Sequence, residues 1–284
     1  LGLRGKQLRY TQEQFYGVVH NSVDVIAKII ERDENLNSPN NKRAAKLRAK
    51  TVMFDEMTPS IIMAGFPMLD WIDIAMSPVC LPGEVDQNAN IMYVDAAERM
   101  GLAADVCPLP SAEVGCAIVD DYPQVGSSFI TSSMPCDGSL GAALFMDRYM
   151  KKLPSFTLTP PQRFNEPETN AYAVKDLKNC IRFIEETYDV KWDWDAFWKK
   201  AEEYNKTTQC MLDKWDVNCT PYPQVIGSAL SLQREYEFQT AACLDSFMTK
   251  QDEKVTKMML KGYEEDREAD RRDYKYRAIV WCSP

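Results

Sequence analysis

Residues 127–159 read SSFITSSMPCDGSLGAALFMDRYMKKLPSFTLT and decide the fold class of this chain. Ser127–Ser132 is a short run with the composition of a strand, and Ser139–Leu153 places apolar side chains at helical spacing. Ser155–Thr159 is a second strand-like run, which two prolines end. A strand, a helix and a strand in this order form a crossover, which pairs the two strands in parallel. The segment therefore predicts an α/β fold with a parallel, Rossmann-like sheet.

Helical patterns precede this segment. Residues from about Thr11 to Glu34 predict a helix, and Lys42 to about Met57 predicts a second one with a basic first half. Such a basic run is usually a solvated face, although it can also bind an anionic ligand or a partner. The apolar side chains of the first helix form one stripe, which comprises Phe15, Val18, Val19, Val23, Ile26, Ile29 and Ile30.

A large helical portion follows the crossover. Residues 166–216 predict two helices with a break near Asp189–Trp192, and two more are expected at Gln233–Thr249 and Asp252–Arg272. The last of these is so charged that we expect it to face solvent. Tyr276–Pro284 has the pattern of a buried strand, which we expect to open a second α/β domain.

These patterns predict four parts of the chain. They are a helical N-terminal segment (1–58), an α/β cluster-binding domain (59–165), a helical region (166–274) and the first strand of a second α/β domain (275–284). The limits follow from changes of pattern and from turn residues between the periodic segments.

Composition narrows the function classes. The chain has 284 residues, is 45% hydrophobic and carries a formal net charge of −9, so it can form a core and repels nucleic acid and anionic membrane surfaces. No apolar run reaches the roughly 18 residues of a membrane span, so we expect no membrane partner. The nine cysteines are an odd number, which favours free thiols in a reducing compartment and a cytoplasmic location.

The single histidine restricts the possible chemistry. His20 lies in a predicted helix, where a structural or solvent-facing role is expected. A zinc site with several histidine ligands is excluded, and a Ser-His or Cys-His pair within this chain would need this one residue. Catalysis, if the chain performs it, must therefore use thiolates, carboxylates or a cofactor.

Two cysteines differ from the other seven by their context. Cys107 and Cys136 both lie in proline-containing turns beside apolar segments, and Cys136 follows the predicted strand Ser127–Ser132. Functional groups gather just past the carboxyl ends of strands in open α/β sheets. No C-x-x-C pair occurs, so the sequence lacks the zinc-ribbon, thioredoxin and ferredoxin signatures. From the residues alone, both ordinary turn cysteines and ligands of a metal cluster stay open.

Three segments together resemble the 2-hydroxyacyl-CoA dehydratase family, which includes benzoyl-CoA reductase subunits. Phe66–Val79 (FPMLDWIDIAMSPV) is similar to the family's F-P-x-E segment with a later P-V, and Cys107–Gly115 is similar to its C-P-L-x-x-S-x-x-G. Phe129–Gly138 (FITSSMPCDG) is similar to its strand followed by T-C-D-G. Their order and spacing, with the helices that follow, extend the likeness over residues 60–284.

The resemblance implies a [4Fe-4S] cluster held by three cysteines, with one iron open to substrate or a small ligand. Cys107 and Cys136 match the first two ligands. The third ligand is expected beyond Pro284, since Cys282 comes too early in the chain. The family pattern also has a glutamate where this chain has Leu69, which puts the corresponding carboxylate role in doubt.

The resemblance further implies an oxygen-sensitive enzyme that eliminates water from a 2-hydroxyacyl-CoA thioester through a ketyl radical. Its partners would be a homologous subunit and an ATP-dependent activator iron–sulfur protein. Two alternatives stay open: a subunit of a benzoyl-CoA reductase-like enzyme, which the change at Leu69 favours slightly, and a non-catalytic electron-relay or scaffold subunit.

Overall fold

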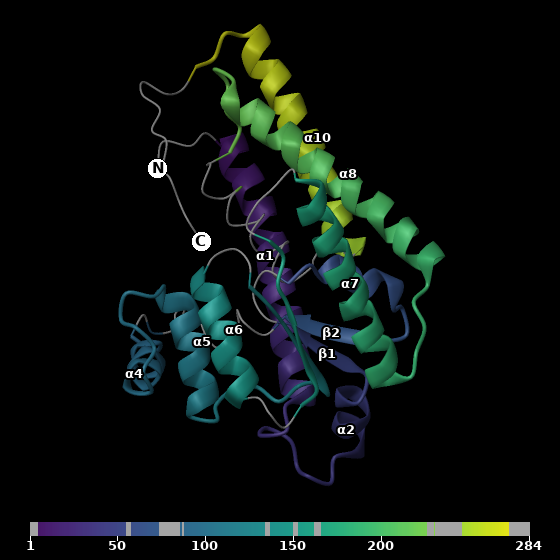
Figure 1. Ribbon diagram of the computed structural model, residues 1–284. Helices are drawn as coiled ribbons and strands as arrows, with labels where there is room; N and C mark the ends of the chain where they lie inside the picture. The colour runs from purple at the N-terminus through teal and green to yellow at the C-terminus, as the bar shows by residue number, and fades with distance from the viewer. Residues whose placement is uncertain are drawn as a thin grey trace. The chain divides into compact units, whose positions relative to one another are not determined.

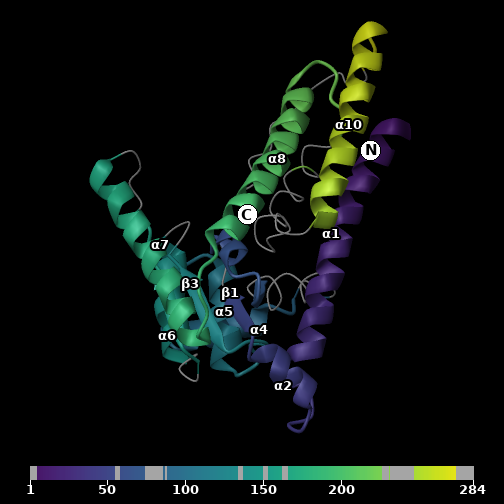
Figure 2. The ribbon, with the colours of Figure 1, turned by 90° about the vertical axis from the view of Figure 1, so that its right-hand side faces the viewer.

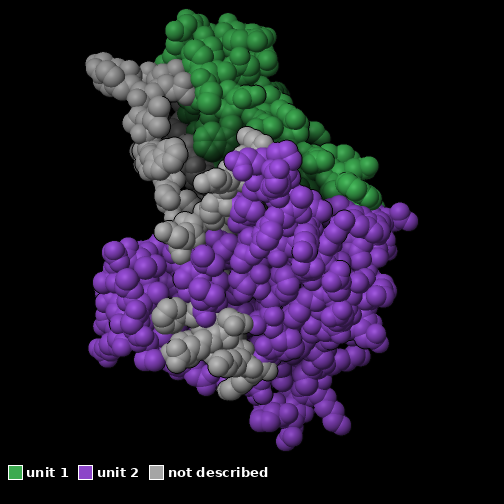
Figure 3. All heavy atoms as spheres, in the orientation of Figure 1, with its two compact units in different colours: residues 1–23, 198–284 green, residues 24–197 purple. Residues whose placement is uncertain are grey.

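The computed structural model describes most of the chain. The described residues are 5–54, 58–73, 86, 88–133, 137–149, 153–161, 166–225, 230 and 246–272. They belong to two compact units, one of residues 24–197 and one that combines residues 1–23 with 198–284 (Figure 3). The strand predicted at residues 275–284 lies outside the described residues.

Helices dominate the described chain, and four strands form its sheet (Figure 1). The elements are α1 (Gly5–Arg32), α2 (Lys42–Arg48), β1 (Thr51–Phe54), the 3-10 helix η1 (Ser60–Gly65), β2 (Asp70–Asp73), α4 (Ile91–Arg99), α5 (Pro108–Ile118), β3 (Ser128–Ser132), α6 (Asp137–Tyr149), β4 (Ser155–Leu158), α7 (Pro167–Tyr188), α8 (Trp194–Cys219) and α10 (Ser246–Glu268).

The sheet has the strand order β2-β1-β3-β4, and every pair is parallel. The predicted crossover is confirmed as β3, α6 and β4, and with it the predicted class, an α/β fold with a parallel sheet and a large helical portion. Met53 is in register with Ile72 on one side and with Phe129 on the other. These three side chains are fully buried in one core with residues of α4, α5 and α6.

Helices cover both faces of the sheet. In Figure 1, α4, α5 and α6 lie together on one side of the strands and α7 on the other. Phe156 of β4 points away from the Phe129 face and contacts Phe183 of α7, with 5.6 Å between ring centroids. Parallel sheets are stable when both faces are covered, which is why β1 and β3 are buried along their whole length.

The helix predicted from Lys42 to Met57 is wrong in its second half. α2 ends at Arg48, and Thr51–Phe54 forms β1 instead. A strand buried on both faces does not alternate between apolar and polar residues, so its pattern resembles a buried helix segment. The strand β2 was also not predicted. The domain limits drawn from the sequence stay predictions.

The apolar stripe predicted on the first helix does not coincide with the buried side of α1. Ile29 packs against the sheet core, whereas the other stripe residues whose side chains are described are exposed to solvent: Phe15, Val19, Val23, Ile26 and Ile30. The buried side of the first half carries Tyr10 with the polar Gln7, Thr11 and Gln14. Periodicity identified the helix, but not the face that it buries.

The second unit is built from the first half of α1, α8 and α10. α10 lies beside α1 and runs in the opposite direction (Figure 2), since Lys6 Nζ lies 2.7 Å from Asp266 Oδ1 and Lys254 Nζ lies 2.6 Å from Glu13 Oε2. The expectation that Asp252–Arg272 faces solvent is wrong for one side of α10. Val255 and Met259 are buried in the core of this unit.

Two buried carboxylates explain why the charged sequence of α10 was misread. Asp252 and Asp266 are both fully buried, and each is paired with a lysine, Lys214 of α8 and Lys6 of α1 respectively. Buried charges occur when they are paired in this way. α10 also runs without interruption through the break expected between Thr249 and Asp252.

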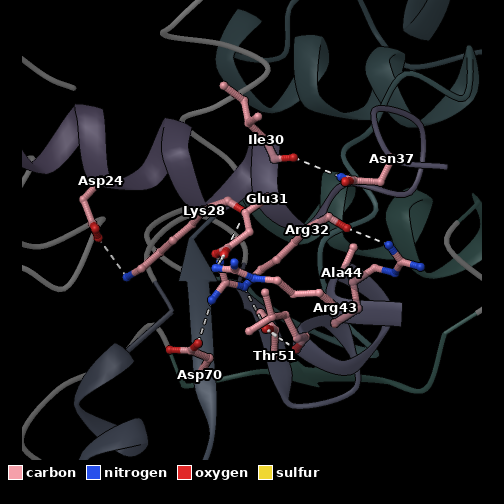
Figure 4. Close-up of polar contacts among 12 residues, drawn as sticks. Asp24, Lys28, Ile30, Glu31, Arg32, Asn37, Arg43, Ala44, Thr51 and Asp70 are labelled. Carbon is pink, nitrogen blue, oxygen red and sulfur yellow. Dashed lines mark hydrogen bonds and ion pairs between the residues drawn. The ribbon is translucent and has the colours of Figure 1, made fainter. Parts of the chain in front are cut away.

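Arg32 fastens the end of α1 to the beginning of two strands (Figure 4). Its guanidinium is buried and donates to Asp70 Oδ2 at 2.7 Å and to Thr51 Oγ1 at 3.3 Å. Arg48 in turn donates to the Arg32 carbonyl at 2.8 Å. Because Thr51 and Asp70 are the first residues of β1 and β2, this cluster lies where the strands begin and holds the sheet together there.

We expect Arg32→Ala to lower the free energy of unfolding by about 2–3 kcal/mol, because the hydrogen bonds of a buried cation to Asp70, Thr51, Glu31 and the Lys28 carbonyl are lost together. Urea denaturation measures the change. Arg43→Ala is the matched control, since Arg43 pairs with Glu31 but is 81% exposed, and exposed pairs contribute less than about 1 kcal/mol. Equal losses in both variants would contradict the role of Arg32.

Candidate functional site

The sheet has two unlike edges. The strands begin at Thr51, Asp70, Ser128 and Ser155, and we call this the amino edge; they end at Phe54, Asp73, Ser132 and Leu158, which we call the carboxyl edge. The strand order reverses direction between β1 and β3. Ligands of open α/β sheets bind outside the carboxyl edge at such a switch point. The topology therefore places the candidate site beyond the ends of β1 and β3.

Cys136 is tied to this edge by its place in the chain. The residue itself lies outside the described residues. Ser133 directly follows β3, and Asp137 is the first residue of α6. The four steps of chain from Ser133 to Asp137 span at most about 14 Å, so the two described residues that flank Cys136 in the sequence both lie near the carboxyl edge.

The helix α5 brings Cys107 toward the same edge. The chain between α5 and β3 runs along the amino edge, because Gln124 exchanges hydrogen bonds with Asp33 and Glu34 and Ser127 N donates to Thr51 O at 3.0 Å. The C-terminal end of α5 therefore lies at the amino edge and its first residues point toward the carboxyl edge. Helices α5 and α6 also pack against each other.

Cys107 is the N-cap residue of α5. Its carbonyl oxygen accepts from Ser111 N at 3.3 Å and from Ser111 Oγ at 2.9 Å, whereas its side chain makes no capping hydrogen bond and is exposed. Pro108 and Pro110 have no amide hydrogen, so Leu109 has the one N–H of the first three helical residues. The thiol is thus not used to cap the helix, and it lies exposed at the start of α5.

The other described cysteines have different surroundings. Burial raises the pKa of Cys116 and of Cys180 to about 12, which keeps both thiols protonated. Burial also raises the pKa of the Cys210 thiol. Cys219 is exposed, but it lies at the end of α8. Among the described cysteines, Cys107 alone combines exposure with a helix start.

The described residues by themselves do not complete a metal site. No group of three His, Cys, Asp or Glu side chains in the described ranges is placed to hold a metal ion. Cys80, Cys136, Cys243 and Cys282 lie outside those ranges. The assignment of Cys107 and Cys136 as ligands therefore stays a prediction.

Close packing against α4 explains why the C-P-L segment has a glycine at Gly115. A Cβ atom at this position would lie 1.7 Å from Tyr93 O, because the backbone of α4 passes directly over α5 here. The contact fixes α5 against α4, and α5 carries Cys107 at its start. The sequence showed the glycine but not the helix that requires it.

The F-P segment has a structural role where it is described. Phe66 is fully buried and contacts Trp192 edge-on, with 5.3 Å between ring centroids. Leu69 immediately precedes β2 and therefore lies at the amino edge. What the replacement of the family's glutamate by Leu69 means for the site stays a prediction. Residues 74–79 of this segment lie outside the described residues.

Sequence reasoning missed one carboxylate at the carboxyl edge. Asp73 is the last residue of β2 and is only 4% exposed. An aspartate that ends a buried strand is the signal that could have identified it, but β2 was itself not predicted. Asp73 lies two strands away from β3, with β1 between them.

A comparison with protein families identifies a family that matches most of the chain. The model of the family described as 2-hydroxyglutaryl-CoA dehydratase, D-component, matches residues 84–284. These residues are more than two thirds of the chain, and they include Cys107, Cys136 and the elements from α4 onward. No curated protein matches the chain. In the described residues, no helix is both long enough and apolar enough to cross a membrane.

Proposed function

This chain belongs to the 2-hydroxyglutaryl-CoA dehydratase D-component family, and we propose that it is the iron–sulfur subunit of a 2-hydroxyacyl-CoA dehydratase. In this proposal Cys107 and Cys136 bind a [4Fe-4S] cluster, and water is eliminated from the substrate through a ketyl radical. The observation that carries the proposal is the exposed, uncommitted Cys107 thiol at the start of α5, on the edge of the sheet where β3 leads to Cys136.

The surroundings of Cys107 fit a cluster ligand. Iron–sulfur clusters are bound by cysteine thiolates, and the sulfur of Cys107 is exposed at the start of α5. Cys107 donates nothing to the helix cap, so binding iron would not remove a hydrogen bond from the fold. The third protein ligand is proposed to lie beyond Pro284. When bound, such a cluster supplies an electron at low potential and a Lewis-acidic iron.

The protein's own residues have simpler tasks in this proposal. Cys107 and Cys136 would hold the cofactor, and the buried ends of β1 and β3 would restrict the entry of water. Helix starts at the carboxyl edge provide positive potential for the thiolates and for the thioester oxygen of an acyl-CoA, where negative charge develops. The single histidine is not needed for any of these tasks.

The proposal includes three partners. They are an acyl-CoA thioester substrate, a homologous partner subunit and a separate ATP-dependent activator iron–sulfur protein. The division of labour with an activator is supported by the sequence, which contains no G-x-x-x-x-G-K-[ST] loop. We place the protein in the cytoplasm in this proposal, because an odd number of cysteines favours free thiols and a reducing compartment keeps thiols free.

Iron and acid-labile sulfide content, with an electron paramagnetic resonance spectrum, test the proposal on protein purified without oxygen together with its partner subunit. We expect about four of each per subunit and a loss of iron in Cys136→Ser. Activity with a 2-hydroxyacyl-CoA, compared with an aromatic acyl-CoA, distinguishes the dehydratase from a ring reductase. Folded, oxygen-free protein without iron would overturn the cluster, and normal iron in Cys136→Ser would overturn that ligand.

A further inference from the structure

Ser111 holds the backbone of Cys107 through two hydrogen bonds. The backbone N of Ser111 donates to the Cys107 carbonyl oxygen at 3.3 Å, and its side-chain Oγ donates to the same atom at 2.9 Å. The hydroxyl lies in the interior, since Ser111 is only 3% exposed. Within the part of the chain that the structure describes, Cys107 forms no hydrogen bond with any other residue. The position of this carbonyl group therefore depends on one neighbour, and the shorter bond comes from its side chain.

The start of α5 leaves little else to fix Cys107. Pro108 and Pro110 have no amide hydrogen, so neither can donate to a carbonyl group that precedes the helix. Pro108 does restrict the residue before it to an extended backbone, and Cys107 has a φ of −50° and a ψ of 132°. One restraint from a proline ring and the bonds from Ser111 thus set the direction of the Cα–Cβ bond that carries the sulfur.

Ser111 lies on a part of α5 that is fixed by packing. It precedes Gly115 by four residues, so it lies about one turn before the point where the backbone of α4 passes directly over α5. Its neighbours Pro110 and Ala112 are buried as well. The hydroxyl therefore connects an exposed cysteine to a turn of helix that has little freedom to move.

We infer that Ser111 is a positioning residue for the iron–sulfur cluster. The inference rests on the proposed function, in which Cys107 is a ligand of that cluster. The Ser111 hydroxyl holds the Cys107 carbonyl group, and this bond restricts the backbone rotation that would move the sulfur. Removal of a group that orients a metal ligand through a hydrogen bond typically lowers metal affinity by about 10- to 100-fold. Ser111 would act through Cys107 alone and needs no contact with iron.

A purely structural role is the alternative that the experiment must separate. Serine and threonine hydroxyls in helices can donate to the carbonyl oxygen four residues earlier, and such a bond can serve only the helix itself. A structural bond changes the stability of the fold, whereas a positioning bond changes the behaviour of the cluster. Thr256 provides the comparison in α10, in the other unit. It is 4% exposed, and its Oγ1 donates to Asp252 O at 2.8 Å across the same four-residue spacing.

The experiment compares Ser111→Ala, Ser111→Thr and Thr256→Val with wild type, each purified without oxygen together with the partner subunit. The rate at which a chelator removes iron is measured, and the electron paramagnetic resonance spectrum and the urea midpoint are recorded on the same samples. We expect Ser111→Ala to lose iron about tenfold faster than wild type and to shift the resonance positions. Alanine is the best helix former, so α5 itself should remain. Ser111→Thr keeps the hydroxyl and should lose iron at the wild-type rate.

Thr256→Val should lower the urea midpoint and lose iron at the wild-type rate. A wild-type rate and an unchanged spectrum in Ser111→Ala would overturn the inference and leave the proposed function intact. Iron loss that is equally fast in Thr256→Val, or a Ser111→Ala variant that does not fold, would show that the bond serves general stability and would also overturn it. Folded, oxygen-free wild-type protein without iron would overturn the proposed function and the inference with it.

Discussion

Cys107→Ser is expected to lose most of its iron and to retain less than about 0.1% of the dehydration activity, because the electron-transferring cofactor carries this chemistry. The fold should survive. Cys107 is exposed and its side chain caps nothing, and serine is among the best N-cap residues, so the start of α5 should be as stable as before or more so. Iron analysis of the anaerobically purified protein and a urea unfolding curve measure the two expectations.

Two other cysteines provide the controls for this prediction. Cys219→Ser changes a thiol that is also exposed but lies at the end of a helix, and Cys210→Ser changes a half-buried thiol in α8. Both variants should keep the full iron content. Normal iron in Cys107→Ser would remove this residue from the site, whereas a large loss in Cys210→Ser would show that other cysteines hold the cluster.

Gly115→Ala is expected to lower the free energy of unfolding by about 3–5 kcal/mol, near the upper end for a single substitution. The added Cβ would lie 1.7 Å from Tyr93 O, 2.4 Å from its carbonyl carbon and 2.8 Å from its Cα. All three are backbone atoms, so no side-chain rotation relieves the clash. The helix α4 must move away from α5, and the buried contacts of Ala97 and Val114 are disturbed with it.

Gly141→Ala is the matched control for this substitution. Gly141 also lies inside a helix, α6, but a Cβ atom there meets nothing within 4 Å. Alanine should therefore stabilise the protein by up to about 1 kcal/mol through its higher helix propensity. Urea denaturation of the two variants gives the comparison. A Gly115→Ala variant as stable as Gly141→Ala would contradict the close packing of α4 on α5.

The elements that the sequence predicted well are those with local signals. The strands β3 and β4 have β-branched and aromatic residues between turn residues, and α6 between them has apolar side chains at helical spacing. Chain connectivity alone then makes the two strands parallel. The same local signals singled out Cys107 and Cys136 as turn cysteines beside these elements, while their roles rest on the family and on the proposed cluster.

Other features depended on residues far away in the chain. Nothing near Thr51–Phe54 distinguishes a strand buried on both faces from a helix segment, because the distinction lies in its neighbours β2 and β3. Likewise, Asp252 and Asp266 looked like solvated charges until Lys214 and Lys6 were seen beside them.

The sequence by itself therefore determined the fold class, the crossover and the family to which the chain belongs, since these follow from periodicity, turn residues and the spacing of motifs. The tertiary structure decided which edge of the sheet each motif occupies. It placed Leu69 at the amino edge and turned the start of α5 with Cys107 toward the carboxyl edge. The physical reason is that side-chain periodicity is a local property, whereas contact between residues distant in sequence arises only when the strands pair and the helices pack on them.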